Sequence, residues 1–340
     1  MLQFKHKIIA IRVILFSLLS LIFIFLLVTI ILTKAKDDVP NRPINSASSV
    51  SDESSAADVA LHDVVAEPEA VAPEYPKMSN DTKAFDPKFV VSEYAVLLDV
   101  QSNNILAQKS SNTRIYPASL TKMMTLLVAV DHIKNYNDTF TISYDILAPL
   151  VKANASRAGF SVGEPVRMID LLYAAILPSG ADATVGLAVS LAGSEDNFAK
   201  LMNDKAKELG LRDTHFVNTS GLHNPNHYST VTDMAVIMKA VLSNSLCKTI
   251  ISAQDYTTAP TAQHPNGIKL YSDTFRKMYG TEVENVVISG GKTGYTDQSG
   301  NCLATYAVKN GKEYIAVTAK GSGPYRPIYD SFAIYGKYLP

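Results

Sequence analysis

Hydrophobic positions form three successive patterns along this chain of 340 residues, and the first is a single long block. Residues Val13 to Thr33 are uncharged and almost wholly apolar over 21 positions. A helix of that length crosses the ~30 Å hydrocarbon core of a bilayer. Lys5, Lys7 and Arg12 precede the block, which favours a cytoplasmic N-terminus. We therefore expect a transmembrane anchor at residues 13–33, a cytoplasmic segment at 1–12, and the rest of the chain outside the cytoplasm.

A cleaved signal peptide is the alternative for this block. Signal peptides have an apolar region of about 7–15 residues followed by a small-x-small cleavage site. No such site follows Thr33, although Lys34 and Lys36 weaken the charge asymmetry on which the orientation depends. The pattern favours an uncleaved anchor in the cell membrane.

The second pattern is polar. Between Asp37 and Pro76, Ser, Ala and Pro are frequent, and nine acidic residues stand against a single basic one. Such a segment cannot bury enough apolar surface to offset the entropy of ordering it. We predict a disordered acidic linker over residues 34–84 and a folded domain over 85–340. The short apolar stretches Val59–Leu61 and Val64–Val65 could instead bind a partner.

The third pattern covers the predicted folded domain, where strand-like runs come first and helical spacing follows. A strand-like run at Tyr94–Val100, a turn at Asn103-Asn104 and a second run at Ile105–Ala107 predict a hairpin. Met123–Ile133 is apolar on nearly every face, which is typical of a helix buried inside a domain. Apolar spacing of three to four residues predicts further helices at Leu171–Leu177, Glu195–Leu209 (with Gly210 as C-cap) and Thr232–Leu242.

Strands return near the C-terminus. Cys302–Val308 and Tyr314–Ala319 flank Asn310-Gly311, which is a strong two-residue hairpin signal. A final helix is predicted over Tyr325–Tyr338. Strands at both ends and helices between them predict one α/β unit, in which both ends of the domain build a sheet and a helical lobe is inserted.

Composition narrows the possible functions. A net charge of −1 and a pI near 6.7 give no basic face, so no nucleic-acid partner is expected. Cys247 and Cys302 form either one bridge or two buried thiols. Pro225 separates His223 from His227 and disfavours a helix that presents both, and no Glu follows the first histidine. We expect a surface loop there, and neither a metal nor a cofactor.

Three motifs carry the candidate chemistry: Pro117–Lys122, Leu177–Asp182 and Gly290–Gly294. Ser119 and Lys122 are three residues apart, so they share one face if the segment is helical. A serine hydroxyl needs a neighbouring base, and a lysine serves only when it is neutral. Burial together with a second cation, such as Lys292, would lower the pKa of Lys122. Alone, Ser-x-x-Lys would more often mark a helix start, with Ser119 as the cap and Lys122 in solvent.

With Asn218-Thr219-Ser220-Gly221-Leu222, these motifs make the chain from about Tyr94 onward resemble the D-alanyl-D-alanine carboxypeptidases, the low-molecular-mass penicillin-binding proteins. The resemblance implies the β-lactamase/transpeptidase-like fold, with an antiparallel sheet and an inserted helical lobe. It implies removal of the terminal D-alanine of peptidoglycan stem peptides through an acyl-enzyme on Ser119. It also implies covalent inhibition by β-lactams.

The resemblance further assigns roles to individual residues. Ser179 would relay a proton, and the backbone N–H groups of Ser119 and Tyr295 would stabilise the oxyanion. Gly290, Gly291 and Gly294 would let the strand edge approach the substrate, because no Cβ stands in the way. The candidates are therefore Ser119, Lys122 and Ser179 for catalysis, and Lys292, Thr293, Gly294, Tyr295 and, less strongly, Arg326 for substrate binding.

The middle motif departs from the family pattern. The family usually has Ser-x-Asn, whereas this chain has Ser179-Gly180-Ala181. The amide that would contact the substrate and orient Lys122 is missing, and Asp182 is shifted by one residue, which should turn it away. Acylation needs only Ser119 and Lys122, so the departure puts turnover in question. Two other functions stay open: a tethered receptor with little turnover and, disfavoured because no Glu-x-x-x-Asn precedes Lys292, a β-lactamase.

Overall fold

A computed structural model describes residues 74–278 and 283–340 of the chain. The anchor predicted at residues 13–33, the cytoplasmic segment 1–12 and most of the predicted linker lie outside these residues. Within the described part, no single helix is long and apolar enough to cross a membrane. Two successive helices, Val231–Ser243 and Ser245–Ser252, reach that length only as a pair bent by 109°.

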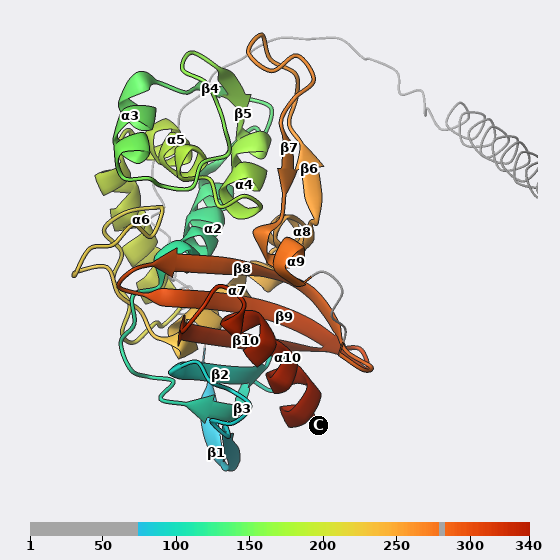
Figure 1. The fold of residues 1–340 in the computed structure, drawn as a ribbon. Coiled ribbons are helices and arrows are strands. Elements are labelled where there is room, and N and C mark those ends of the chain that lie inside the picture. Colours follow the sequence, from blue (N-terminus) through green and yellow to red (C-terminus); the bar gives the residue numbers. More distant parts are fainter. Residues whose placement is uncertain (1–73, 279–282) are drawn as a thin grey trace, which may run out of the picture. The chain divides into compact units, whose positions relative to one another are not determined.

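A six-stranded sheet forms one half of the domain (Figure 1). Its strands lie in the order β1 (Lys77–Ala84), β3 (Asn104–Lys109), β2 (Tyr94–Asp99), β10 (Lys312–Gly321), β9 (Gly300–Lys309) and β8 (Val287–Thr296). Four of the five pairings are antiparallel, but β1 runs parallel to β3. The sheet is therefore mixed. The expectation of an antiparallel sheet is wrong for strand β1.

Strand β1 also corrects the predicted boundary between linker and domain. It lies inside the segment 34–84 that the composition assigned to the linker, so the folded part begins before residue 85. Seven of its eight residues are exposed, and the sequence Lys-Met-Ser-Asn-Asp-Thr-Lys-Ala has no apolar alternation. Backbone hydrogen bonds to β3 hold this strand in place. The pattern of its side chains does not indicate that pairing, so the sequence did not predict the strand.

Helices cover both faces of the sheet. In Figure 1, α10 (Arg326–Tyr338) crosses in front of the strands and α7 (Val231–Ser243) lies behind them. Alternate residues of β2 enter two separate cores: Val96 and Leu98 pack on the side of α7, and Leu97 packs with Tyr335 of α10. A strand buried on both faces reads as a continuous apolar run, which is the pattern of Tyr94–Val100 in the sequence.

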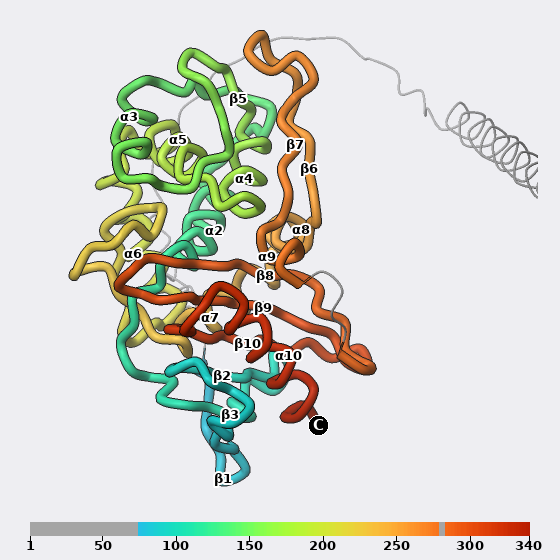
Figure 2. The backbone as a smooth tube through the Cα atoms, viewed as in Figure 1, coloured from blue at the N-terminus to red at the C-terminus, as the bar shows by residue number. Residues whose placement is uncertain are grey.

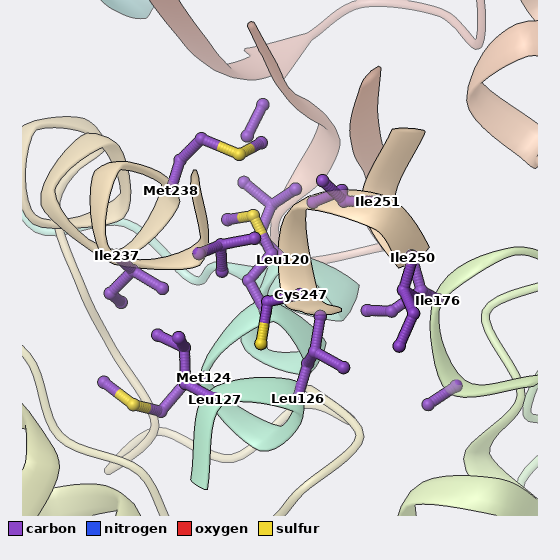
Figure 3. Packing of buried hydrophobic residues seen from close by; sticks show 14 of the residues in the cluster. Leu120, Met124, Leu126, Leu127, Ile176, Ile237, Met238, Cys247, Ile250 and Ile251 are labelled. Carbon is purple, nitrogen blue, oxygen red and sulfur yellow. The ribbon is translucent and has the colours of Figure 1, made fainter. Parts of the chain in front are cut away.

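The other half of the domain is a helical lobe. It contains α3 (Tyr144–Lys152), α4 (Met168–Ile176), α5 (Ala181–Ala192), α6 (Glu195–Glu208) and the short strands β4 (Thr139–Thr141) and β5 (Pro165–Arg167). Helix α2 (Lys122–His132) lies between the lobe and the sheet (Figure 1). Figure 3 shows Leu126 and Leu127 of α2, and Leu120 just before it, packed against residues of α7 and α8 (Ser245–Ser252). The central position of α2 explains why it is apolar on nearly every face.

A narrow hairpin extends from the sheet along the lobe. Strands β6 (Asp255–Thr257) and β7 (Lys269–Tyr271) form it, and Figure 2 shows it running beside α4 and β5. The hydroxyl of Tyr256 donates to the Asp170 carboxylate at 2.7 Å, and the Tyr256 ring stacks on Tyr173 with 3.8 Å between centroids. The short helix α9 (Asp273–Met278) follows and brings the chain back to β8.

Most elements predicted from the sequence are confirmed. The hairpins at Asn103-Asn104 and Asn310-Gly311 are present, and both residues of the second turn have positive φ angles (52° and 75°), as a type I′ turn requires. Helix α6 ends at Glu208, and Gly210 follows with a φ of +67°. Cys247 and Cys302 are buried free thiols, the second of the two alternatives.

Candidate active site

Ser119 sits in a short 3₁₀ turn, Ala118–Thr121, that leads directly into α2. The residue before it, Ala118, has a φ of +47°, a left-handed conformation that is strained for a residue with a Cβ. Gly221 packs against this peptide so closely that a Cβ at 221 would lie 1.8 Å from the Ala118 carbonyl oxygen. Among the described residues, the Ser119 backbone N–H has no acceptor. The turn therefore presents a hydroxyl and a free donor together.

Lys122 is buried to 1% exposure, and its amine contacts three oxygens. Its Nζ lies 3.1 Å from Ser119 Oγ, 3.2 Å from Ser179 Oγ and 2.7 Å from the Ser179 carbonyl oxygen. A neutral lysine amine has two N–H donors and one lone pair. Donation to the Ser179 carbonyl leaves the lone pair free to accept the Ser119 proton. The geometry fits a general base and excludes the solvated lysine of a simple helix start.

The surroundings of Lys122 favour its neutral form. Burial lowers the pKa of Lys122 well below its ordinary value, and the positive charge of Lys292 lowers it further, against the opposing charges of Asp182 and Asp273. Lys292 is itself fully buried, and burial lowers its pKa to about 7. These are the two causes expected from the sequence, burial first and the neighbouring cation second.

Ser179 owes its double contact with Lys122 to its backbone. Its φ of +61° is left-handed, which turns both its carbonyl and its hydroxyl towards the lysine. The Ser156 hydroxyl donates to the same carbonyl at 2.6 Å and fixes its direction. Ser179 is nearly buried, so its contacts with Lys122 are shielded from water. Ser156 is a positioning residue that the sequence analysis did not single out.

The residues after Ser179 show what the altered middle motif does. Ala181 lines the cleft and packs with Ile146 and Leu150 of α3. Asp182 points away from Ser119: its buried carboxylate accepts the backbone N–H of Ala158 at 2.9 Å and that of Gly159 at 3.2 Å. Asp182 therefore holds the loop that walls one side of the cleft, in agreement with the expectation that the one-residue shift turns it away.

Strand β8 forms the opposite wall, at the edge of the sheet. Gly294 lies so close to the nucleophile that a Cβ there would be 3.0 Å from Ser119 N. Gly290 and Gly291 serve a different purpose from the predicted one. A Cβ would meet the Ile251 carbonyl oxygen at 2.7 Å from the first and the Ala304 carbonyl oxygen at 2.6 Å from the second. These two glycines allow packing inside the protein, and only Gly294 keeps space beside Ser119.

A cleft of about 590 Å³ joins these parts. Of the predicted site residues, its lining includes Ser119, Lys122, Ser179, Thr293, Gly294 and Tyr295. Lys292 lies beneath the surface, where its Nζ donates to the Thr293 carbonyl at 2.9 Å. Arg326 does not line the cleft, and its guanidinium lies 3.9 Å from Asp330. The role of Arg326 in binding the substrate carboxylate stays a prediction.

A family model described as D-alanyl-D-alanine carboxypeptidase matches residues 81–322. The chain belongs to this family. Among its relatives, the D-alanyl-D-alanine carboxypeptidase DacF of Bacillus subtilis is 32% identical over 236 residues, which is 68% of this chain and 57% of that protein. DacC of Escherichia coli is 32% identical over 231 residues, covering 65% of this chain and 54% of that protein. The chain thus matches only a little over half the length of these relatives.

The fold of this carboxypeptidase-family chain also matches solved structures. The Streptomyces K15 DD-transpeptidase is 28% identical, with a TM-score of 0.66 over 74% of this chain and 98% of that one. This likeness supports the penicillin-recognising α/β fold predicted from the motifs. A carboxypeptidase of the same Streptomyces strain is 31% identical over 229 residues, which is 65% of this chain and 78% of that protein.

Two charged residues of this family member line the cleft although no motif contains them. Asp273 and Lys277 lie on α9, one helical turn apart, and the charge of Asp273 acts on both Lys122 and Lys292. The helix has only six residues, so periodicity gave no signal for it. The two histidines have different surroundings: His223 lines the cleft, and the buried His227 contacts Thr121 Oγ1 at 2.7 Å. The described residues contain no cluster of His, Cys, Asp and Glu that could hold a metal ion.

Proposed function

We propose that this chain is a serine D-alanyl-D-alanine carboxypeptidase that removes the terminal D-alanine of peptidoglycan stem peptides. One observation carries the proposal: a buried lysine with a lowered pKa lies 3.1 Å from the hydroxyl of Ser119, at the floor of an open cleft. This is the arrangement of a nucleophile with its base. The curated relatives DacF and DacC are carboxypeptidases by name, which supports the same reaction here.

The steps follow from the positions of these groups. Lys122 takes the proton of Ser119, and Oγ attacks the carbonyl carbon of the penultimate D-alanine. The negative charge that develops on the carbonyl oxygen is stabilised by the N–H groups of Ser119 and Tyr295. The proton then passes from Lys122 through the Ser179 hydroxyl, 3.2 Å away, to the nitrogen of the leaving D-alanine. An ester on Ser119 remains, and water hydrolyses it with Lys122 as base.

The same first step acylates Ser119 when the amide is that of a β-lactam ring. The ring opens and its carbonyl carbon stays bonded to Oγ, so β-lactams act as covalent inhibitors. Lys292 and Thr293, at one end of the cleft wall, are the groups expected to meet the substrate carboxylate. Arg326 stays the weaker candidate for the same contact, because it is not among the residues that line the cleft.

Release of D-alanine from a peptide that ends in D-alanyl-D-alanine tests the proposal. The full-length protein is expected to release D-alanine and to be labelled by a fluorescent penicillin, and Ser119→Ala should abolish both. Labelling that persists in Ser119→Ala would refute the nucleophile. Ala181, where the family has Asn, favours a second function, a penicillin-binding receptor with little turnover. Labelling of Ser119 without any release of D-alanine would establish that function instead.

We further propose that residues 13–33 anchor the protein in the cell membrane, with the catalytic domain outside the cytoplasm. The length of the apolar block and the basic residues before it support this proposal. Protease added to intact cells should release a fragment that begins in the acidic segment, while residues 1–33 stay with the membrane. A mature N-terminus mapped just after Thr33 would show cleavage and overturn the anchor.

A further inference from the structure

We propose that a second hollow beside the catalytic cleft binds a carboxylate of the substrate peptide, on the N-terminal side of the bond that is cut. This inference rests on the proposed function, because it extends the substrate-binding site of the same reaction. The hollow has a volume of about 410 Å³ and is separate from the cleft that contains Ser119. No sequence motif and no proposed catalytic step accounts for it.

The two hollows are neighbours, because the same segments of the chain line both of them. Gln298 lines both of them. Three segments pass from one to the other: Ile115 and Tyr116 precede the nucleophile, Asn226 follows His223, and Ser299 follows Asp297. The Tyr116 ring packs edge-on against His223, with 4.6 Å between the centroids. A peptide that leaves the cleft over Gln298 therefore enters the second hollow directly.

The direction of the substrate points to the same place. Lys292 and Thr293, which are expected to meet the terminal carboxylate, come before Gly294 along β8. The oxyanion donor Tyr295 follows, and β8 ends at Thr296. The peptide on the other side of the scissile bond must therefore extend past the end of the strand, where the turn containing Gln298 connects β8 to β9. The second hollow lies at that turn.

The lining of the second hollow favours an anion. It includes two cationic residues, Arg114 and Lys320, and no acidic residue. The Arg114 guanidinium lies over the Tyr228 ring at 4.1 Å from its centroid and is also paired with Asp213. Lys320 is less engaged: its side chain is half exposed, and Glu93 lies 3.7 Å away, beyond hydrogen-bonding distance. Lys320 can therefore turn to a carboxylate of the substrate.

The walls of the hollow are held in place before any ligand arrives. Ile115 and Ser229 exchange backbone hydrogen bonds of 2.7 and 3.0 Å, which ties the segment before the nucleophile to the loop that carries Tyr228. The backbone of Tyr228 is bonded in turn to His215 at 2.9 and 3.0 Å. A site that is already formed loses less entropy on binding, so a charged contact there contributes more of its energy to affinity.

Matched peptides test the proposal. One peptide ends in D-alanyl-D-alanine and carries Glu two positions before that dipeptide, and its matched partner carries Gln at the same position. The Glu peptide should have a kcat/KM about fivefold above the Gln peptide, and Lys320→Gln should reduce that ratio to about one. Lys312→Gln, an exposed charge removed from the far end of the same strand, should leave the ratio unchanged.

Binding of the same peptides to the full-length Ser119→Ala variant, measured by calorimetry, gives a readout that needs no turnover. If no peptide releases D-alanine, the proposed reaction fails, while the Glu-to-Gln difference in affinity still decides the second site. Equal affinities and equal kcat/KM values for the Glu and Gln peptides would overturn the inference. A preference for Glu that persists in both Lys320→Gln and Arg114→Gln would overturn it as well.

Discussion

The carbonyl oxygen of Ser179 lies 2.7 Å from Nζ of Lys122, closer than either serine hydroxyl that the same nitrogen contacts. The catalytic lysine is thus aimed mainly by a backbone group, which the left-handed conformation of Ser179 makes available. A backbone acceptor cannot be removed by a side-chain change. This contact explains how Lys122 can be oriented although Ala181 replaces the asparagine usual in the family.

The first prediction concerns Ala181→Asn. Because Lys122 already has three oxygen partners, the added amide should act on the substrate and not on the lysine. We expect a higher kcat/KM for D-alanyl-D-alanine peptides through a lower KM, with the pH profile unchanged. Ala181→Leu is the matched control, since it adds similar volume without an amide. An acid limb displaced in Ala181→Asn alone would show that the amide does orient Lys122.

The second prediction concerns the pH profile. Burial and the charge of Lys292 lower the pKa of Lys122, so replacing Lys292 by methionine removes one of these causes. The pKa of Lys122 should rise, and the neutral base should be lost at a higher pH than before. The acid limb of penicillin acylation in Lys292→Met should therefore move to higher pH. Lys277→Met is the control, because the charge of Lys277 acts on Lys292. An equal displacement in both variants would contradict the direct effect of Lys292.

The third prediction concerns Gly221→Ala. The new Cβ would overlap the Ala118 carbonyl at 1.8 Å, so the peptide that carries Ser119 must move. Displacement of a reacting group by about 1 Å costs on the order of 10²-fold in rate. Gly311→Ala makes the same change at a similar φ (75° against 80°) but with open space around the Cβ. We expect acylation to collapse only in Gly221→Ala. Similar rates in the two folded variants would refute the steric argument.

The fourth prediction concerns acid stability. Burial lowers the pKa of His227 from 6.5 to about 4, so the folded protein resists its protonation. Between these two values the unfolded chain binds a proton that the folded chain does not, and stability must fall as the pH decreases from about 6.5 towards 4. The loss from this group is on the order of 3 kcal/mol.

Urea unfolding at pH 7 and pH 4.5 measures this effect when the protein is compared with His227→Gln. The glutamine keeps a polar contact with Thr121 but cannot titrate. The variant should lose less stability between the two pH values than the parent does. Identical losses would mean that other groups cause the loss of stability in acid and that keeping His227 neutral does not reduce the stability.

Local signals in the sequence predicted most of the fold. Turn residues located both hairpins, and the buried helix α2 was visible because a helix surrounded by protein is apolar on all sides. Strand β1 was missed because its pairing with β3 leaves its side chains exposed. The hairpin of β6 and β7 was missed because three-residue strands are too short for alternation. Their positions depend on contacts with residues far away in the sequence.

The candidate site divides in the same way. The spacing of Ser119 and Lys122 predicted their contact, because both residues lie on one turn. No spacing could reveal Asp273 and Lys277, which reach the cleft only because α9 packs beside β8. The glycines were a mixed result: Gly294 borders the nucleophile, whereas Gly290 and Gly291 fit against neighbouring backbone. A glycine in a motif shows that space is needed, and only the packed structure shows by what.

The order of strands has a mechanical consequence. Strand β1, where the chain enters the domain, and strand β8 form opposite edges of the sheet, five strand spacings or ~24 Å apart. Just before β1, the Tyr75 hydroxyl donates to Asp233 at 2.7 Å, and the Arg212 guanidinium covers its ring at 3.9 Å. We expect tension applied through the preceding chain to act first on these contacts of Tyr75 and on the pairing of β1 with β3. None of these contacts involves β8, the edge strand beside Ser119.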